Sequence, residues 1–141
     1  MNLYLDTSAL VKLYVEETGR GTVLDAINKA EVVGTSMIAY VEARAAFARR
    51  RRERGIARSD YLRCVRDLER DWPRYLRFEL NEPLIFTAGR LTERYRLHAY
   101  GAVHLASALS MQGPLGNVTF ACWDRYLNAA ARRTGLALLS E

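Results

Sequence analysis

The fold is decided by the stretch Leu3-Tyr4-Leu5-Asp6-Thr7-Ser8-Ala9-Leu10-Val11 near the N-terminus. An apolar run that favours a strand ends at Asp6, and a helical pattern begins directly after it. Asp6 followed by Thr7 and Ser8 is typical of a helix N-terminus, where short oxygen-bearing side chains accept hydrogen bonds from free backbone N–H groups. In a parallel sheet Asp6 would also lie at the carboxyl ends of the strands, where ligands bind. A helix cap and a functional acid are therefore both open for Asp6.

The rest of the chain alternates between strand and helix patterns. The expected strands cover residues 3–5, 31–35, 75–80, 117–122 and 136–139. The expected helices cover residues 8–15, 22–29, 83–96, 102–111 and 124–133, together with one from a Ser36 cap to a stop at Gly55 and one from Ser59 to the residue before Pro73. Strands that alternate with helices pair in parallel through right-handed crossovers. The sequence therefore predicts an α/β fold, a three-layer α/β/α sandwich around a small parallel sheet.

The composition indicates one folded domain. The chain has 141 residues, half of them hydrophobic, which is enough for a three-layer core and excludes a disordered chain. We expect a single domain over residues 1–141. No apolar segment is long enough to cross a bilayer and no signal peptide is recognisable, so we expect a cytoplasmic protein that does not associate with a membrane. Cys64 and Cys122 form no C-x-x-C motif and are expected to be reduced core thiols.

The charge of the chain is basic and comes almost entirely from arginine. The formal net charge is +5, and only two of the 21 basic residues are lysines. Arginine makes bidentate contacts with phosphate and stacks on bases, which favours RNA as a partner. Arg49, Arg50, Arg51 and Arg52 form a run at the end of an expected helix. This run has two interpretations. It is a solvated helix end that complements the helix dipole, or it contacts the RNA backbone.

Glu42 is distinguished by its apolar surroundings. It is the only acid between residues 37 and 47, and helical spacing from Ile38 and Ala45 places it on or beside the buried stripe of its helix. A carboxylate in that position is costly unless a cation or a metal pairs with it. A salt bridge to Arg44 or to a neighbouring helix is one interpretation, and a ligand role is the other.

Asp124 repeats the arrangement of Asp6, because it follows an apolar strand and precedes a helix. If Asp6, Glu42 and Asp124 converge, unit charges ~4 Å apart repel by ~4 kcal/mol at an effective dielectric constant near 20, so the cluster must hold a cation or protons. Oxygen ligands without His or Cys select a hard ion, Mg²⁺ or Mn²⁺. A hard ion beside a basic surface favours phosphodiester chemistry.

Four segments of the chain, in order and with matching spacing, resemble the four motifs of the PIN domain, and more narrowly those of VapC-type toxins of toxin–antitoxin pairs. The segments are Leu5-Asp6-Thr7-Ser8-Ala9-Leu10-Val11-Lys12, Ser36-Met37-Ile38-Ala39-Tyr40-Val41-Glu42-Ala43, Ala99-Tyr100-Gly101-Ala102-Val103-His104-Leu105-Ala106 and Phe120-Ala121-Cys122-Trp123-Asp124-Arg125-Tyr126-Leu127. The resemblance implies a Mg²⁺-dependent ribonuclease that cuts tRNA or rRNA. It also implies a homodimer that a partner antitoxin inhibits.

The resemblance assigns Asp6, Glu42 and Asp124 to the first, second and fourth acids of the family. The third acid is replaced by Gly101, which is the one serious departure. A substitution and a natural loss both explain this glycine, and the intact flanking motif favours a substitution. With one acid missing, we expect little or no RNA cleavage by this chain. Cys122 also stands where relatives often carry Ser or Thr.

Two alternative functions remain beside the ribonuclease. One is a catalytically inactive PIN-fold module that binds RNA or an antitoxin. The other is a phosphotransfer enzyme that uses Asp6, which would need a lysine near the phosphate. Lys12 and Lys29 are the only lysines, which argues against it. His104, in an apolar helix, is expected to be a hydrogen-bonded structural residue and not a base.

Overall fold

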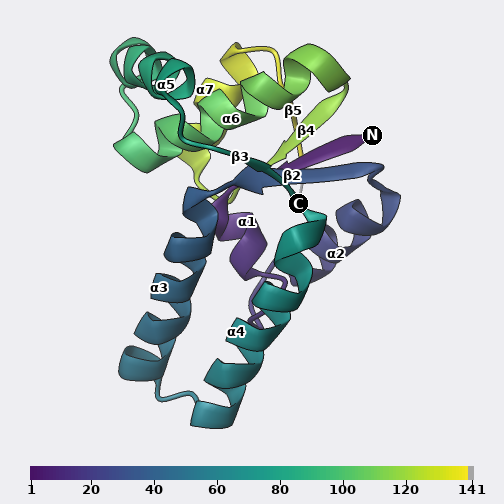
Figure 1. Cartoon of the computed structure of the whole chain (residues 1–141), viewed down its shortest axis with the longest axis vertical. Coiled ribbons are helices and arrows are strands. Elements are labelled where there is room, and N and C mark those ends of the chain that lie inside the picture. The colour runs from purple at the N-terminus through teal and green to yellow at the C-terminus, as the bar shows by residue number, and fades with distance from the viewer. Residues whose placement is uncertain (140–141) are drawn as a thin grey trace.

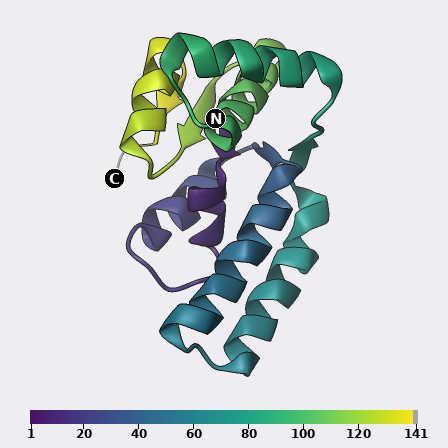
Figure 2. The ribbon, with the colours of Figure 1, turned by 90° about the vertical axis from the view of Figure 1, so that its left-hand side faces the viewer.

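The computed structural model describes residues 1–139 as a parallel sheet with helices packed on both faces (Figures 1 and 2). The five strands are β1 (Asn2–Leu5), β2 (Val32–Ser36), β3 (Leu76–Phe78), β4 (Val118–Ala121) and β5 (Ala137–Leu138). The helices are α1 (Thr7–Val11), α2 (Arg20–Lys29), α3 (Ile38–Arg54), α4 (Arg58–Asp71), the 3₁₀ turn η1 (Trp72–Arg74), α5 (Glu82–Tyr95), α6 (Ala99–Leu115) and α7 (Arg125–Arg133). The predicted α/β/α sandwich is confirmed.

The sheet has the order β3-β2-β1-β4-β5, and all neighbouring strands are parallel. The chain builds outward from β1 through β2 to β3, and then returns to the other side of β1 to form β4. The order of the strands therefore reverses between β1 and β4. In open parallel sheets, ligands bind at such a switch point, outside the carboxyl ends of the strands. Asp6 follows β1 and Asp124 lies just beyond β4, so both lie at this point.

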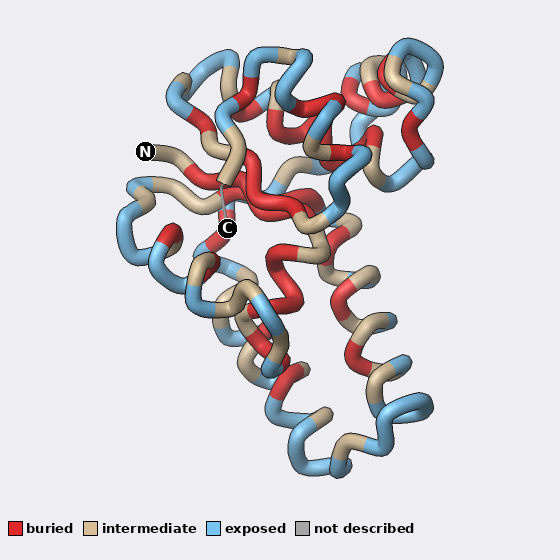
Figure 3. The backbone as a smooth tube through the Cα atoms, turned by 180° about the vertical axis from the view of Figure 1, so that it is seen from behind, coloured by how far each residue is buried: buried red, intermediate tan, exposed pale blue. Residues whose placement is uncertain are grey.

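Two hydrophobic cores lie on the two faces of the sheet. Tyr4 and Phe120 face α5, α6 and α7, and their rings stack with centroids 5.7 Å apart. Leu3 and Leu5 point the other way, into the core shared with α1, α2, α3 and α4. This alternation follows from the two-residue period of a strand. Because both faces are covered, the central strands β1 and β4 are largely buried, as the red central segments in Figure 3 show, whereas the edge strands β3 and β5 are partly exposed.

Helices α3 and α4 form an antiparallel hairpin that projects away from the sheet (Figures 1 and 2). Gly55 ends α3 with φ of 64°, a left-handed conformation that glycine adopts without steric cost. The far end of the hairpin is exposed, whereas the inner parts of both helices pack against the core (Figure 3).

Several element boundaries differ from those expected. The first helix ends at Val11 instead of residue 15. Ser36 belongs to β2 and is not the cap residue of α3, although its Oγ accepts a hydrogen bond from the Ile38 amide at 3.2 Å. Helix α6 begins at Ala99 and continues past Pro114 to Leu115. Proline is tolerated there because it lies in the last turn, and Gly116 closes the helix at φ of 65°.

Cys64 and Cys122 are buried free thiols, as expected. None of the helices within residues 1–139 has the length and apolar character needed to cross a membrane.

Candidate active site

Asp6 is the N-cap of α1 and is 6% exposed. Its Oδ1 accepts hydrogen bonds from the Ala9 amide at 3.0 Å and from Ser8 Oγ at 2.6 Å. The Asp6 amide donates to the Ala121 carbonyl at 3.1 Å, which fixes this residue against the end of β4. The cap interpretation is therefore correct for Asp6, and the capping carboxylate is held at the switch point of the sheet.

Asp124 lies across the same edge as the N-cap of α7. Its Oδ1 accepts from the amides of Tyr126 at 2.9 Å and Leu127 at 3.2 Å, and the residue is exposed. The adjoining Trp123 amide donates to Ser8 Oγ at 3.0 Å. Ser8 therefore bridges the Asp6 carboxylate and the segment that carries Asp124.

The thiol of Cys122 lies between these two acids. Burial and the nearby Asp6 carboxylate raise its pKa well above the ordinary value, so it remains a neutral thiol. Its Sγ accepts a hydrogen bond from the Asp124 amide at 3.2 Å.

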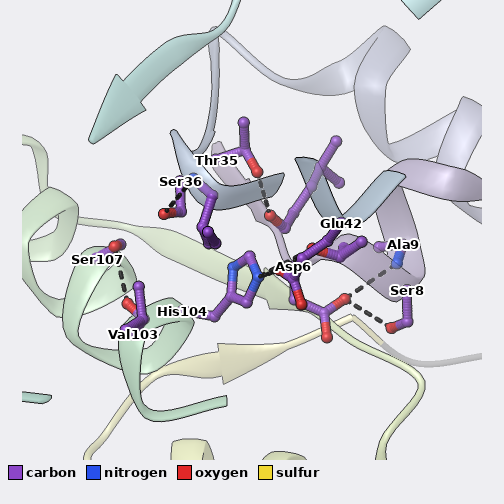
Figure 4. A network of polar contacts seen from close by, with 12 residues as sticks. Asp6, Ser8, Ala9, Thr35, Ser36, Glu42, Val103, His104 and Ser107 are labelled. Carbon is purple, nitrogen blue, oxygen red and sulfur yellow. Dashed lines mark hydrogen bonds and ion pairs between the residues drawn. The ribbon is translucent and has the colours of Figure 1, made fainter. Parts of the chain in front are cut away.

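Glu42 contacts α6 and the start of α1 through one carboxylate oxygen (Figure 4). Its Oε1 lies 2.6 Å from Thr7 Oγ1, which donates to it, and 2.9 Å from His104 Nε2. Burial raises the pKa of Glu42, but the hydrogen bonds from His104 and Thr7 and the charge of His104 outweigh it, so the net pKa is lowered. Arg44 is not its partner, because that side chain contacts Tyr40 and Glu69 instead. Of the two structural interpretations, the pair with a neighbouring helix is correct.

The contact between His104 and Glu42 was not predicted from the sequence. His104 is 3% exposed and hydrogen-bonded on both ring nitrogens, as expected for a structural histidine. Its Nδ1 lies 2.9 Å from the hydroxyl of Tyr4, and burial raises the pKa of that hydroxyl well above its ordinary value. The Tyr4 hydroxyl occupies Nδ1, and the N–H on Nε2 points at Glu42. His104 thereby orients Glu42.

Gly101 lies in the first turn of α6 with no need for the conformational freedom of glycine. A Cβ atom at this position would meet only the Leu127 side chain, at 3.6 Å and 3.7 Å, which is ordinary van der Waals contact. An aspartate therefore fits sterically, and a negative charge near a helix N-terminus is favourable.

The three acids do not form a complete ligand set as the chain stands. Within residues 1–139, no three Asp, Glu, His or Cys side chains are arranged to hold a metal ion. Carboxylate oxygens are the ligands that a hard cation such as Mg²⁺ prefers, so the types of residue fit. Their positions do not, because three of them do not come together in the described part of the chain. We therefore derive no reaction step through a metal for this chain.

The four arginines of the run 49–52 are not equivalent. Arg50 pairs with Glu17, and Arg49 pairs with Glu53 at 3.1 Å. The Arg51 guanidinium lies 6.0 Å from the ring centre of Tyr61, and Arg52 is exposed. The first two arginines therefore form ion pairs, and the other two form none within residues 1–139.

Lys12 is also committed to other contacts. It is 7% exposed, its Nζ lies 3.1 Å from Glu17 Oε1, and it sits 4.7 Å above the ring of Trp123. Lys12 is therefore paired with Glu17 and not with Asp6, which weighs against the phosphotransfer alternative.

Comparison with known proteins identifies relatives over nearly the full length of the chain. The model of the PIN domain family matches residues 3–116. The ribonucleases VapC45 and VapC49 of two Mycobacterium tuberculosis strains (CDC 1551 / Oshkosh and H37Rv) are each 35% identical over 133 residues, which cover 94% of this chain and 91% of theirs.

Solved structures share the fold at low sequence identity. A structure of FitAB bound to an IR36 DNA fragment superposes with a TM-score of 0.70 at 16% identity, covering 96% of this chain and 92% of that one. A toxin–antitoxin complex from Klebsiella pneumoniae superposes with a TM-score of 0.64 at 14% identity, covering 86% of each chain. At these identities the likeness shows the fold alone.

Proposed function

Since this chain belongs to the PIN-domain family and to its VapC-type branch, we propose that it is the ribonuclease toxin of a toxin–antitoxin pair and hydrolyses RNA phosphodiester bonds. The observation that carries the proposal is the acidic edge at the switch point of the sheet. There Asp6 and Asp124 follow adjacent strands, and Glu42 hydrogen-bonds to Thr7, the residue after Asp6, and to His104.

In this proposal Asp6, Glu42 and Asp124 are the catalytic acids. They are also the ligands of Mg²⁺, or of Mn²⁺, once a fourth acid completes the set. Gly101 occupies the position of that acid, and a Cβ atom there makes only ordinary van der Waals contact with Leu127. The same glycine impairs this chain, because Mg²⁺ is held by few carboxylates and each lost ligand weakens the site.

We further propose a partner antitoxin and a homodimer. The Klebsiella relative is a toxin–antitoxin complex, which supports an antitoxin as the partner. The homodimer rests on the family resemblance alone. The class of RNA, tRNA or rRNA, also rests on it.

The alternative, an inactive PIN-fold module that binds RNA or an antitoxin, is favoured by one observation. No three candidate ligands come together within residues 1–139, which is what loss of the metal site would produce. The two functions differ in one expected result: replacing Gly101 by an acid restores RNA cleavage in the ribonuclease and does not in the inactive module.

Growth of a bacterial host separates these two functions. Induction of the chain as it stands should leave growth nearly unchanged, and induction of Gly101→Asp should arrest it. Asp6→Asn in the Gly101→Asp background should restore growth at equal protein level. If Gly101→Asp does not slow growth although the protein is folded and free of antitoxin, the inactive module is the better description.

A further inference from the structure

All of the net positive charge of this chain lies at one place. Residues 49–63, which we call the arginine tip, contain seven arginines and two acids, a net charge of +5 that equals the formal net charge of the whole chain. The remaining residues contain fourteen basic and fourteen acidic side chains, so the body of the protein is electrically balanced. Attraction of a polyanion therefore originates at this tip and not over the surface as a whole.

The tip is the exposed end of the α3–α4 hairpin, away from the sheet (Figures 1 and 3). Its arginines fall into two groups. Arg49, Arg50 and Arg63 each pair with an acid. The other four are exposed and form no ion pair within residues 1–139: Arg51, Arg52, Arg54 and Arg58.

Helix stability does not account for these four arginines. Basic residues in the last turn of α3 complement the helix dipole, but Arg58 lies in the first turn of α4, where a positive charge opposes it. Arg51 and Arg54 are also like charges three positions apart on one helix, which repel each other. A polyanion bound at the tip would offset both repulsions.

A groove connects the tip with the acidic edge. It has a volume of about 650 Å³ and runs along α3 from Glu42 to Arg54. Its lining is mixed in charge and includes Glu17, Glu42, Glu53, Arg49, Arg50, Arg54 and Tyr100, with Ala45 and Ala46 between Glu42 and the arginines. Tyr100 is 56% exposed and offers a ring on which a base can stack. Glu42 and Arg54 lie twelve positions apart on α3, or ~18 Å at 1.5 Å per residue.

We propose that the arginine tip is a second RNA-binding surface, which holds the phosphate backbone of a folded RNA ~18 Å from the acidic edge. This inference rests on the proposed ribonuclease function and refines it. The substrate is an RNA large enough to contact both ends of the groove, and a short oligonucleotide bound at the acidic edge does not reach the tip. Arginine suits this role because its planar guanidinium binds phosphate in a bidentate manner.

Binding without cleavage tests the proposal. The chain as it stands is kept in EDTA, and its affinity for labelled tRNA and for a labelled trinucleotide is measured by fluorescence anisotropy over a series of salt concentrations. In the tip variant, Arg51, Arg52, Arg54 and Arg58 are replaced by Gln. The matched control replaces four exposed arginines of α5, α7 and the turn after α5, namely Arg90, Arg94, Arg96 and Arg132. Both variants lose the same charge.

The tip variant should bind tRNA at least about tenfold more weakly, and its salt slope should fall by about 3, because about four phosphate contacts are lost. The control variant should keep most of the affinity and slope, and the trinucleotide should bind both variants equally. The melting temperature of the tip variant should not fall, since like charges are removed.

Two results would overturn the proposal. Equal losses in both variants would mean that only net charge matters. An unchanged tRNA affinity of the tip variant would exclude the tip, and loss of a co-expressed antitoxin from that variant alone would then assign the surface to a protein. Because no outcome depends on cleavage, a failure of Gly101→Asp to cut RNA would remove the ribonuclease function and leave this binding result standing.

Discussion

At the scale of single residues, the acid site depends on a buried chain of hydrogen bonds from Tyr4 through His104 to Glu42. Each of these side chains comes from a different element, so the chain of bonds also links β1, α6 and α3. Partners that orient a ligand residue commonly change metal affinity or activity by about 10–100-fold when removed. Tyr4 and His104 are therefore positioning residues in this account.

Tyr4→Phe tests this chain of bonds with little change of shape. The phenyl ring keeps the stacking on Phe120, but His104 Nδ1 loses its hydrogen-bond partner and is left as a buried unpaired polar atom. We expect the free energy of unfolding to fall by about 1–3 kcal/mol. Chemical denaturation measures it, with Tyr126→Phe as the control, since Tyr126 is 57% exposed. An equal effect of the two substitutions would contradict the role of the Tyr4 hydroxyl.

At the scale of elements, the two capping aspartates serve a helix and the acid site at once. Asp124→Ala removes the cap of α7 and should cost about 0.5–2 kcal/mol, whereas Asp124→Asn keeps a capping oxygen and should cost little. In the Gly101→Asp background, both substitutions should abolish RNA cleavage, because both remove the charge. Thermal denaturation and a cleavage assay on each variant separate the two roles. Cleavage retained by Asp124→Asn would mean that Asp124 is a cap only.

The strand–acid–helix pattern made the fold and the edge position of Asp6 and Asp124 predictable. Helix α5 was predicted to within one residue at each end; Pro83 lies in its first turn, and the structure adds Asn81 as its cap through the Leu84 amide. The end of α6 was less predictable. A proline normally ends a helix, but Pro114 lies in the last turn of α6, where it removes only one backbone hydrogen bond.

Pairing between distant segments could not be predicted. Tyr4 and His104 are 100 positions apart, and no periodicity within α6 indicates which histidine nitrogen faces Glu42. The partner of Glu42 was open for the same reason. Arg44 lies close to it in sequence, but the fold turns Arg44 towards Glu69 on α4.

At the scale of the whole molecule, charge and chemistry are separated in space. The acids gather at the carboxyl edge of a balanced body, and the surplus of positive charge lies at the end of a projecting hairpin. In the proposed function, this arrangement lets the hairpin attract RNA without neutralising the acids, because exposed charges farther apart than the Debye length of about 8 Å at physiological ionic strength are largely screened from each other.

The central claim is that this chain carries a PIN-family ribonuclease site interrupted at one position, Gly101. Cleavage of total RNA by purified protein tests it most directly, with the chain as it stands and the Gly101→Asp variant each assayed in Mg²⁺ and in EDTA. The account predicts little or no cleavage by the chain as it stands. It predicts strong cleavage by Gly101→Asp that EDTA abolishes. Robust, EDTA-sensitive cleavage by the chain as it stands would contradict the account, because the missing acid would then be dispensable.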